Sequence, residues 1–357
     1  MKNCMDWREL SMSKILSANV IQDVVYIPDI KEIECISYQS GAPSYVGRKE
    51  GKKYHSSCIN CHNPRCMKLG RDEIECKSFP GMSHDMNLDI CPANAIKQNS
   101  NQVTIDERKC FGCGLCVSRC PVGALYIKNE KAEVNLDNDL PRRKAQPSSA
   151  ALKEQERAIT NLLGIKHTGN MIMESEASMN KIYRKIKRLP QEQQNLFARN
   201  ILICLSNNAT ISRHGDVYLR MDGYYENTDK HGVVEVETGQ DMLDVSRAIL
   251  DDIAVLSARH KIPKEENSAL AICLNLANRR TDYWQEVKDI KDVTGIKIST
   301  VTFAILLIFM WNALEIEDFD DFYIDVDDSS LRKEAEKILG RRIRISSGHE
   351  GMIENSK

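Results

Sequence analysis

The stretch CFGCGLCVSRCP, residues 110–121, decides the fold of the N-terminal part of the chain. Its cysteines, Cys110, Cys113, Cys116 and Cys120, follow the spacing C-x2-C-x2-C-x3-C-P. Three thiolates at that spacing can converge on one cubane cluster from a tight loop, while the fourth turns away toward a second cluster. The run therefore predicts an iron–sulfur protein with two 4Fe–4S clusters.

A second half-motif lies upstream of this run. Cys58, Cys61 and Cys66 form C-x2-C-x4-C, and Cys91 stands directly before a proline. Cys76 lies in the long insertion before Cys91, so either Cys66 or Cys76 can be the third ligand of the first loop. We favour Cys66, because a four-residue gap still allows one loop to wrap a cluster.

CPANAI (Cys91–Ile96) and CPVGAL (Cys120–Leu125) are two copies of one pattern, each followed by a short β-like stretch, which indicates a pseudo-twofold module. The segment from about residue 54 to about residue 136 resembles the two-cluster bacterial-type ferredoxin family. The resemblance implies crossed pairing, in which each group of three cysteines is completed by the cysteine–proline of the other motif. The first motif departs from the family in its displaced third cysteine and its long insertion.

The alternative for these cysteines is structural zinc, since C-x2-C pairs also occur in zinc knuckles. A tetrahedral zinc site needs only four thiolates and requires neither the x2, x2, x3 spacing nor the repeated C-P-x-x-A, so we favour clusters. His55 and His62 flank the first motif and are weaker ligand candidates than an ordinary polar loop. Gly112 and Gly114 fit the cluster interpretation, because loop glycines let backbone N–H groups approach the sulfurs.

The chain has 357 residues, enough for two or three domains, and a formal net charge of −2, which neither demands nor excludes a nucleic-acid partner. Most of its 13 cysteines belong to the cluster region, and MKNCMDWREL at the start has no apolar signal core. We therefore expect a reducing, cytoplasmic location. The longest apolar run, Val301–Leu314, is too short to cross a bilayer and predicts a buried helix or strand, so no membrane partner is expected.

The order of patterns predicts an α+β multidomain protein: a ferredoxin-like dicluster module followed by an α/β domain with a mixed central sheet. We place an N-terminal segment of unknown role at residues 1–53, the cluster module at 54–137, a linker at 138–151 and the second domain at 152–357. Helices are expected over Ala151–Leu163, Ser178–Leu189, Gln191–Leu205 and Asp241–His260, with a buried strand over Ala269–Leu276.

The helix MNKIYRKIKRL (Met179–Leu189) carries an apolar face and a basic face. That basic face could bind phosphates, although a solvated surface helix has the same pattern. No Gly-rich phosphate loop or nucleotide-binding fingerprint is found in the sequence, so ATP, NAD and flavin sites are not supported.

The segment HGDVYLRMDGYYENTDKHGVVEVETGQ, which begins at His214, predicts two strands rich in carboxylates. Period-two alternation places Asp216 and Asp222 on one face of the first strand, and Glu235 and Glu237 on one face of the second. A turn near residues 226 and 227 would set Asp216 opposite Glu237 and Tyr218 opposite Glu235, with Asp222 near the turn. Carboxylates gathered in this way favour a magnesium or manganese ion as counter-cation.

This layout resembles the PD-(D/E)XK nuclease superfamily over roughly residues 178–312. The resemblance implies a restriction-endonuclease-like domain in which Asp216 and Glu235 bind the metal and Glu237 stands where most members have lysine. Glu237 would bind a second metal or hold the attacking water. Gln240 is a weak additional match, and Glu192 is a candidate further ligand.

Three functions follow from these patterns. The chain is a metal-dependent nuclease, a hydrolase, with a cluster module as anchor or redox sensor; or an electron carrier whose second domain docks a partner; or a scaffold with an inactive nuclease fold. The first implies DNA or RNA as partner, and the second implies a redox partner protein.

Overall fold

We describe the protein from a computed structural model. The structure describes the following residues: 5–6, 36–37, 47–49, 52–54, 66–67, 90–99, 102–119, 125–128, 131–134, 170–172, 176–205, 207–211, 221–226, 230–239, 242–311, 314–316, 318–325, 330–340 and 342–355.

The chain forms two compact units. The first comprises Met1–Gly70, Asn87–His167 and Phe309–Glu315, and the second comprises Arg71–Met86, Thr168–Ile308 and Ile316–Lys357. Within the described residues, no helix has the length and apolar character needed to span a membrane. The predicted domain boundaries stay predictions.

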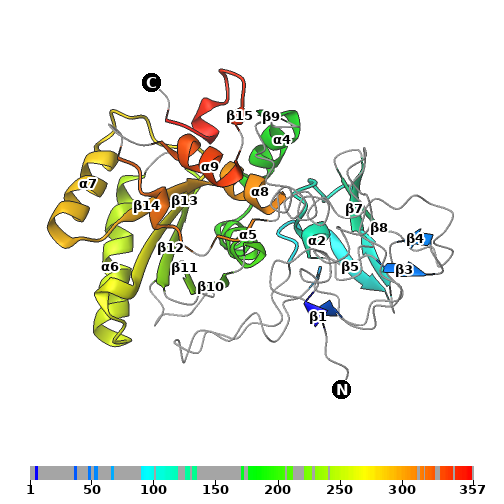
Figure 1. The fold of residues 1–357 in the computed structure, drawn as a ribbon, viewed down its shortest axis with the longest axis horizontal. Helices are drawn as coiled ribbons and strands as arrows, with labels where there is room; N and C mark the ends of the chain where they lie inside the picture. Colours follow the sequence, from blue (N-terminus) through cyan, green and yellow to red (C-terminus); the bar gives the residue numbers. More distant parts are fainter. Residues whose placement is uncertain are drawn as a thin grey trace. The chain divides into compact units, whose positions relative to one another are not determined.

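Short strand pairs and one helix make up the described part of the first unit (Figure 1). Strands β1 (Met5–Asp6) and β2 (Ile36–Ser37) pair in parallel, whereas the other pairs are antiparallel. These are β3 (Gly47–Lys49) with β4 (Lys52–Tyr54), β5 (Ile96–Asn99) with β6 (Gln102–Ile105), and β7 (Leu125–Lys128) with β8 (Lys131–Val134). Helix α2 (Leu115–Ser118) lies within the cysteine run.

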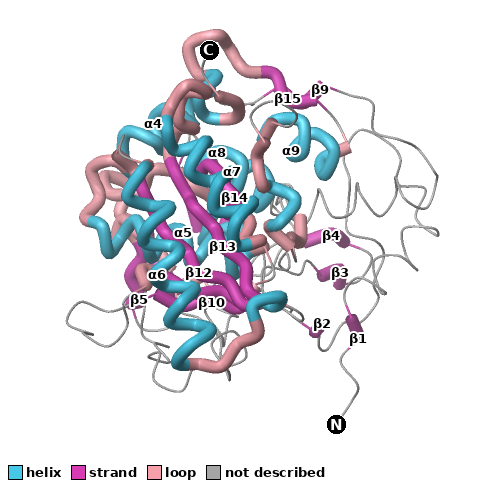
Figure 2. Tube along the Cα trace, turned by 90° about the vertical axis from the view of Figure 1, so that its left-hand side faces the viewer, coloured by secondary structure: helices cyan, strands magenta, loops and turns pink. Residues whose placement is uncertain are grey.

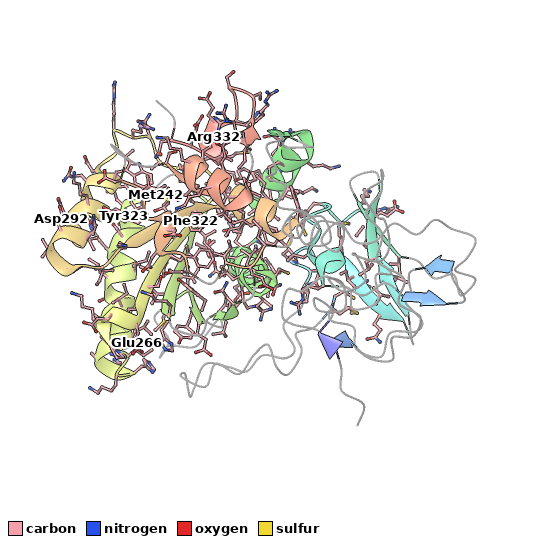
Figure 3. The ribbon with its side chains drawn as sticks, in the orientation of Figure 1. Met242, Glu266, Asp292, Phe322, Tyr323 and Arg332 are labelled. Atoms are coloured by element: carbon pink, nitrogen blue, oxygen red, sulfur yellow. The ribbon has the colours of Figure 1, made fainter. Side chains whose placement is uncertain are left out.

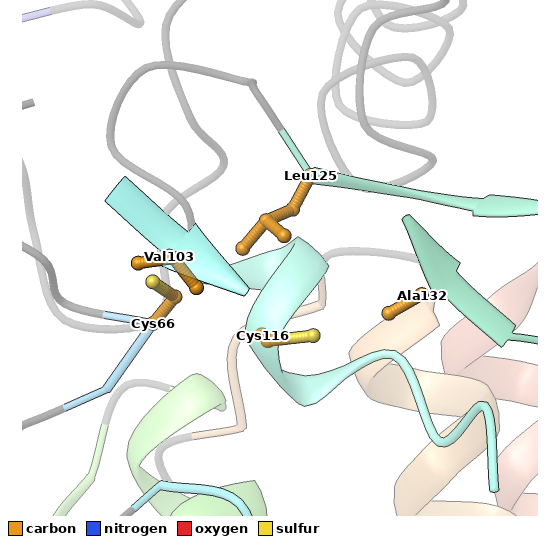
Figure 4. Packing of buried hydrophobic residues seen from close by; sticks show 5 residues of the cluster. All are labelled: Cys66, Val103, Cys116, Leu125 and Ala132. Atoms are coloured by element: carbon orange, nitrogen blue, oxygen red, sulfur yellow. The ribbon is translucent and has the colours of Figure 1, made fainter. Parts of the chain in front are cut away.

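A small apolar core joins the two halves of this module (Figure 4). Val103 comes from β6, Leu125 from β7 and Ala132 from β8, and they pack with Cys66 and Cys116. The β-like stretches after each cysteine–proline therefore form hairpins whose buried faces meet, as the internal repeat predicts.

The second unit is built on a five-stranded mixed sheet in the order β10-β11-β12-β13-β14 (Figures 1 and 2). Strand β11 is antiparallel to both β10 and β12, whereas β12 with β13 and β13 with β14 pair in parallel. Their bounds are β10 (Asn208–Ile211), β11 (Gly223–Glu226), β12 (His231–Glu237), β13 (Asn267–Cys273) and β14 (Ile298–Thr302). The mixed α/β class predicted for this part of the chain is confirmed.

Helices cover both faces of this sheet. Helix α6 (Leu243–Arg259) and helix α7 (Asp282–Thr294) lie on one side, and α5 (Gln191–Cys204) lies on the other (Figure 1). Because the central strands are covered on both faces, Ser268–Cys273 of β13 and all of β14 are buried, as expected for parallel strands. Helix α4 (Glu176–Ile186) precedes α5, and α8 (Phe303–Trp311) follows β14.

A further layer closes the C-terminal part of the second unit. Strand β15 (Arg342–Arg344) pairs with β9 (Asn170–Ile172), and α9 (Leu331–Leu339) precedes β15. Arg332 of α9, labelled in Figure 3, binds Glu336 at 3.0 Å and Glu354 at 3.2 Å. Three 3-10 helices complete the unit: η4 (Lys264–Glu266), η5 (Asp320–Phe322) and η6 (Glu350–Met352).

The structure corrects the predicted hairpin. Gly223 pairs with Val234 and Glu226 with His231, so the hairpin is centred two residues later in the chain than predicted and its register differs. Asp222 is thereby level with Glu235, in the place predicted for Tyr218. The physical reason is burial: Tyr224 and Tyr225 are each 0% exposed and hold the sequence GYYE in the sheet.

Other predicted elements agree with the structure within a few residues. Helices α4, α5 and α6 overlap the predicted helices to within three residues at each end. Strand β13 begins two residues before the predicted buried strand and ends three residues before it. The apolar run from Val301 divides between the end of β14 and helix α8. Strand β10 was not predicted, because its sequence NATI offers no alternation long enough to stand out.

Candidate functional sites

Four cysteines line one pocket in the first unit. Cys91, Cys110, Cys113 and Cys116 line a small pocket that is partly open to solvent. The other lining residues are mostly small or apolar, among them Ala95, Ile105, Phe111, Leu115 and Ala132. The pocket thus gathers three cysteines of the later motif and the cysteine–proline of the earlier one.

The backbone of the later motif curls around this pocket. Gly112 and Gly114 adopt φ values of 70° and 86°, a left-handed conformation that glycine reaches without strain. The loop then enters α2 at Leu115, so that Cys116 lies on the first helical turn. At the start of the motif, the backbone N–H of Cys110 donates to the carbonyl oxygen of Asp106 at 3.0 Å.

Two backbone amides donate hydrogen bonds to the cysteine sulfurs. The N–H of Ala95 lies 3.3 Å from Cys91 Sγ, and the N–H of Ala132 lies 3.4 Å from Cys110 Sγ. Such bonds favour the thiolate over the thiol and tune the potential of a cluster bound through that sulfur.

Burial disfavours the thiolate form of these cysteines unless a metal neutralises its negative charge. Burial, followed by the charges of Cys113, Cys66, Cys91 and Cys110, raises the pKa of Cys116 well above its ordinary value. Burial likewise raises the pKa of Cys91, against the hydrogen bond from Ala95. Crowded thiols in an apolar pocket are a donor set that fits an iron–sulfur cluster, because the cluster takes them as thiolates.

The other predicted cluster ligands are only partly visible. Cys66 is 4% exposed and packs beside Cys116. The other candidate ligands of the two motifs lie outside the described residues: Cys58, Cys61, Cys76, Cys120, His55 and His62. Within the described residues, no three His, Cys, Asp or Glu side chains converge as around a single metal ion. A cubane does not require that convergence, since each cysteine binds a different iron atom.

Glu235 contacts two other carboxyl groups in the second unit. Glu235 of β12 is hydrogen-bonded to Asp222, which lies opposite it at the start of β11. Glu235 is also hydrogen-bonded to Asp252, which comes from α6 and is only 3% exposed. Glu235 therefore contacts two other acidic side chains in a partly buried position, although among the described residues the three carboxyl groups do not converge as around a single metal ion.

Proximity and burial change how these groups titrate. Burial, followed by the charge of Asp222 and contacts with Asp252, raises the pKa of Glu235 to about 9. Burial also raises the pKa of Asp222, although hydrogen bonds with Asn195 and Glu235 oppose it. The carboxyl groups consequently share protons near neutral pH, and a divalent cation would have to displace those protons to bind.

Amide side chains from α5 support the site. Asn195, 6% exposed, contacts Asp222 and accepts a hydrogen bond from Gln191 at 3.1 Å. Gln191 also donates to the carbonyl oxygen of Val236 at 2.9 Å. Helix α5 is in this way tied to β12 at Val236, between Glu235 and Glu237.

Glu237 lies two residues from Glu235 along β12, on the same face of the strand. Its carboxylate accepts a hydrogen bond from the backbone N–H of Gly239. Burial is the main cause of the raised pKa of Asp222, and the negative charge of Glu237 raises it further. Glu237 is paired in the sheet with Cys273, whose pKa is raised to about 12, mainly by burial. Cys273 is a buried core thiol, as its apolar surroundings in the sequence predict.

The structure places the predicted carboxylate site only in part. Glu235 and Glu237 share a face of β12, as predicted, whereas Asp216 and Gln240 lie outside the described residues. Glu192 is exposed at the start of α5. Asp222, expected to be peripheral, is instead in direct contact with Glu235.

Sequence reasoning missed Asp252 and Asn195. Asp252 had a detectable signal, because it interrupts the apolar face of α6 that contains Ile249, Ile253 and Leu256. Asn195 had none, since a glutamine- and asparagine-rich helix start is common on protein surfaces.

Comparison with known proteins relates the first unit to iron–sulfur proteins. Residues 87–131 match the model of the LdpA Fe-S cluster-binding domain. An uncharacterized ferredoxin of Methanocaldococcus jannaschii is 41% identical over 44 residues, which are 12% of this chain and 29% of the relative. An iron–sulfur protein of Rhodospirillum rubrum is 48% identical over 40 residues, 11% of this chain and 21% of the relative. The E. coli hydrogenase-4 component A is 45% identical over 44 residues, 12% of this chain and 22% of the relative.

The chain spans less than a third of the length of each of these relatives. The family model covers Cys91, Cys110, Cys113, Cys116 and Cys120, and the relatives include ferredoxins and an iron–sulfur protein, so the chain contains an iron–sulfur module of the ferredoxin type. A distant likeness exists to the restriction endonuclease FokI bound to DNA, with a TM-score of 0.31 and 11% identity over 62% of this chain and 39% of that chain. At that TM-score the likeness says nothing about fold or activity.

Proposed function

We propose that this chain carries electrons through two 4Fe–4S clusters held by its ferredoxin-type module. The observation that carries the proposal is the pocket lined by Cys91, Cys110, Cys113 and Cys116, which unites the two motifs in the crossed pairing expected from their spacing. By the same pairing, Cys58, Cys61, Cys66 and Cys120 hold the other cluster. A bound cluster accepts and releases one electron at a time.

The chain's own residues prepare the pocket for that role. Apolar side chains such as Phe111 and Leu115 exclude water, and both are buried. The amides of Ala95 and Ala132 stabilise negative charge on the sulfurs. Low polarity favours the less charged oxidation state, while N–H donors favour the more reduced one.

Anaerobic purification tests this function. We expect about eight iron atoms for each chain and absorbance that dithionite bleaches reversibly. Cys91→Ser and Cys113→Ser should damage the same cluster, and the doubly substituted protein should lose no more iron than either single variant. Zinc in place of iron, or additive iron losses in that pair, would disprove the assignment.

A second candidate function is divalent-cation-dependent hydrolysis of phosphodiester bonds in the second unit. It is favoured by the contacts of Glu235 with Asp222 and Asp252. These residues belong to a unit in which three antiparallel strands, β10 to β12, are followed along the chain by helix α6 and the parallel strand β13. That order, with a helix before the first strand, is the one expected for a PD-(D/E)XK nuclease domain. Oxygen-only ligands of this kind suit Mg²⁺ or Mn²⁺.

In this candidate site Asp222 takes the role first expected of Asp216. Asp222 and Glu235 would hold the cation, which supplies Lewis acidity and lowers the pKa of a bound water. Asn195 orients Asp222, and Asp252 holds the proton that Glu235 gives up when a cation binds. Glu237 replaces the lysine common in that superfamily and would position water through its carboxylate.

Cleavage assays on duplex and single-stranded substrates with Mn²⁺ test the second function. Asp222→Asn and Glu235→Gln should abolish cleavage, whereas Asp244→Asn, an exposed carboxylate on α6, should leave it unchanged. Asp216→Asn distinguishes the two assignments of the metal-binding aspartate. Cleavage by Asp222→Asn at the wild-type rate would remove Asp222 from the site.

A further inference from the structure

A basic surface of the second unit lies at the corner between α4 and α5. Between residues 181 and 192 the chain carries five basic residues and a single acidic one, in a protein whose net charge is −2. Arg184, Lys187 and Arg188 are exposed, and none of the three forms an ion pair with a residue that the structure describes. We call these three residues the basic corner.

The orientation of the basic corner is set by burial of the opposite face of α4. Met179, Ile182 and Ile186 are at most 1% exposed. Tyr183, 6% exposed, accepts a hydrogen bond from the backbone N–H of Ala304 at 3.0 Å. With its apolar stripe held against the core, the helix can present its charged side chains only to solvent.

Hydrogen bonds connect this corner to the strand that carries the carboxyl groups. The side-chain amide of Gln194 on α5 donates to the carbonyl oxygens of Ile186 at 3.2 Å and Leu189 at 3.0 Å. These two residues flank Lys187 and Arg188 in the chain. The side-chain carbonyl oxygen of Gln194 accepts a hydrogen bond at 3.0 Å from Thr238, the residue after Glu237. A single buried side chain thus links the basic corner to the end of β12.

We propose that the basic corner binds the phosphate backbone of a nucleic acid and guides it to the carboxylate site. The inference rests on the second candidate function, because it takes the carboxylate site as the place where a phosphodiester is held. A polyanion complements three exposed, unneutralised cations, and exposed Lys and Arg side chains form contacts that do not depend on sequence. Glu192, the single acidic residue between residues 181 and 192, lies at the start of α5.

Binding without chemistry tests the proposal. A labelled DNA duplex of about 20 base pairs is titrated with holoprotein in EDTA at about 50 and about 200 mM salt, and anisotropy is recorded. The variant changes Arg184, Lys187 and Arg188 to Gln, which keeps helix propensity close to that of Arg and Lys. A matched control changes three exposed basic residues elsewhere in the unit to Gln: Arg259, Lys264 and Lys288.

Each phosphate contact contributes about 0.9 to the slope of log affinity against log salt. The wild type should therefore lose about 40-fold more affinity across this salt range than the basic-corner variant, whereas the control should behave like the wild type. Arg184→Lys with Arg188→Lys keeps the charge and should keep the slope. Equal slopes for wild type and basic-corner variant would overturn the proposal.

The same titration with other ligands distinguishes a nucleic-acid surface from a membrane surface. Single-stranded DNA and RNA of the same length report which nucleic acid is preferred, and phosphatidylserine vesicles test a membrane surface instead. Binding to vesicles without binding to any nucleic acid would also overturn the proposal. If the corner variant loses binding but no protein form cleaves DNA or RNA with Mn²⁺, the hydrolytic function fails and the basic corner stands.

Discussion

The carboxyl group of Glu235 on β12 is hydrogen-bonded to the carboxyl group of Asp252 on α6. Two acidic side chains, distant in sequence, can remain in such contact only when a proton or a cation lies between them. This contact couples the stability of the second unit to pH and to divalent cations.

Stability should depend on the protonation of Glu235. Its pKa rises from an ordinary 4.5 to about 9 in the folded protein, so the folded state retains a proton that the unfolded chain releases. The contribution is complete below about pH 4.5 and is lost as pH rises through about 9. Glu235→Gln is neutral at every pH, so its unfolding free energy relative to wild type should rise by at least about 1.4 kcal/mol between pH 5 and 9.

Denaturant unfolding of anaerobic holoprotein at several pH values measures that difference. Glu265→Gln, at an exposed position of η4, serves as the control and should follow the wild type at all pH values. A pH-independent difference between Glu235→Gln and wild type would show that Glu235 is ionised in the folded state.

Manganese binding should strengthen as pH rises toward 9, because the cation replaces the shared proton. Asp252→Asn removes one source of the raised pKa of Glu235, so the pH at which binding becomes strong should move down. Calorimetry at pH 6, 7 and 8 follows both proteins. Binding that survives unchanged in Glu235→Gln would place the cation elsewhere.

Cys66 should be needed for the first cluster and Cys76 should be dispensable. Cys66 is 4% exposed and packs against Cys116 in the core that joins the two halves of the module. Iron content and electron paramagnetic resonance of reduced Cys66→Ser and Cys76→Ser give the answer. Cluster loss only in Cys76→Ser would reverse the assignment.

The amide of Ala132 should raise the reduction potential of the cluster bound to Cys110. Its N–H lies 3.4 Å from Cys110 Sγ and stabilises the more negative, reduced state. A hydrogen bond of about 1 kcal/mol corresponds to about 40 mV for one electron, so Ala132→Pro should lower the potential by roughly that amount. Ala132→Gly keeps the N–H and is the control in a redox titration; equal potentials would contradict the role of the bond.

Gly232 should tolerate no side chain. A methyl group there would overlap the ring of Tyr225, which is fully buried and packs edge-to-face on Phe319 with 5.4 Å between ring centroids. Because the ring cannot move away, Gly232→Ala should cost about 1–3 kcal/mol of unfolding free energy. Gly348→Ala, with no atom within 4 Å of the added carbon, should change it little.

The sequence alone determined the iron–sulfur module, because cluster ligation depends on local spacing. Three thiolates from Cys110, Cys113 and Cys116 can reach one cluster only through a short loop, and that spacing is written in the chain. The amphipathic helices were also readable, since their apolar faces repeat with the helical period, as Ile182 and Ile186 do.

Only the tertiary structure decided which carboxylates meet. Hairpin register depends on which side chains the core accepts, and burial of Tyr224 and Tyr225 moved the turn and set Asp222 beside Glu235. Asp252 reaches the same point from a helix that crosses the sheet, a contact that no local spacing encodes. The cluster motif is local and could be predicted, whereas the carboxylate site is assembled from distant segments by packing.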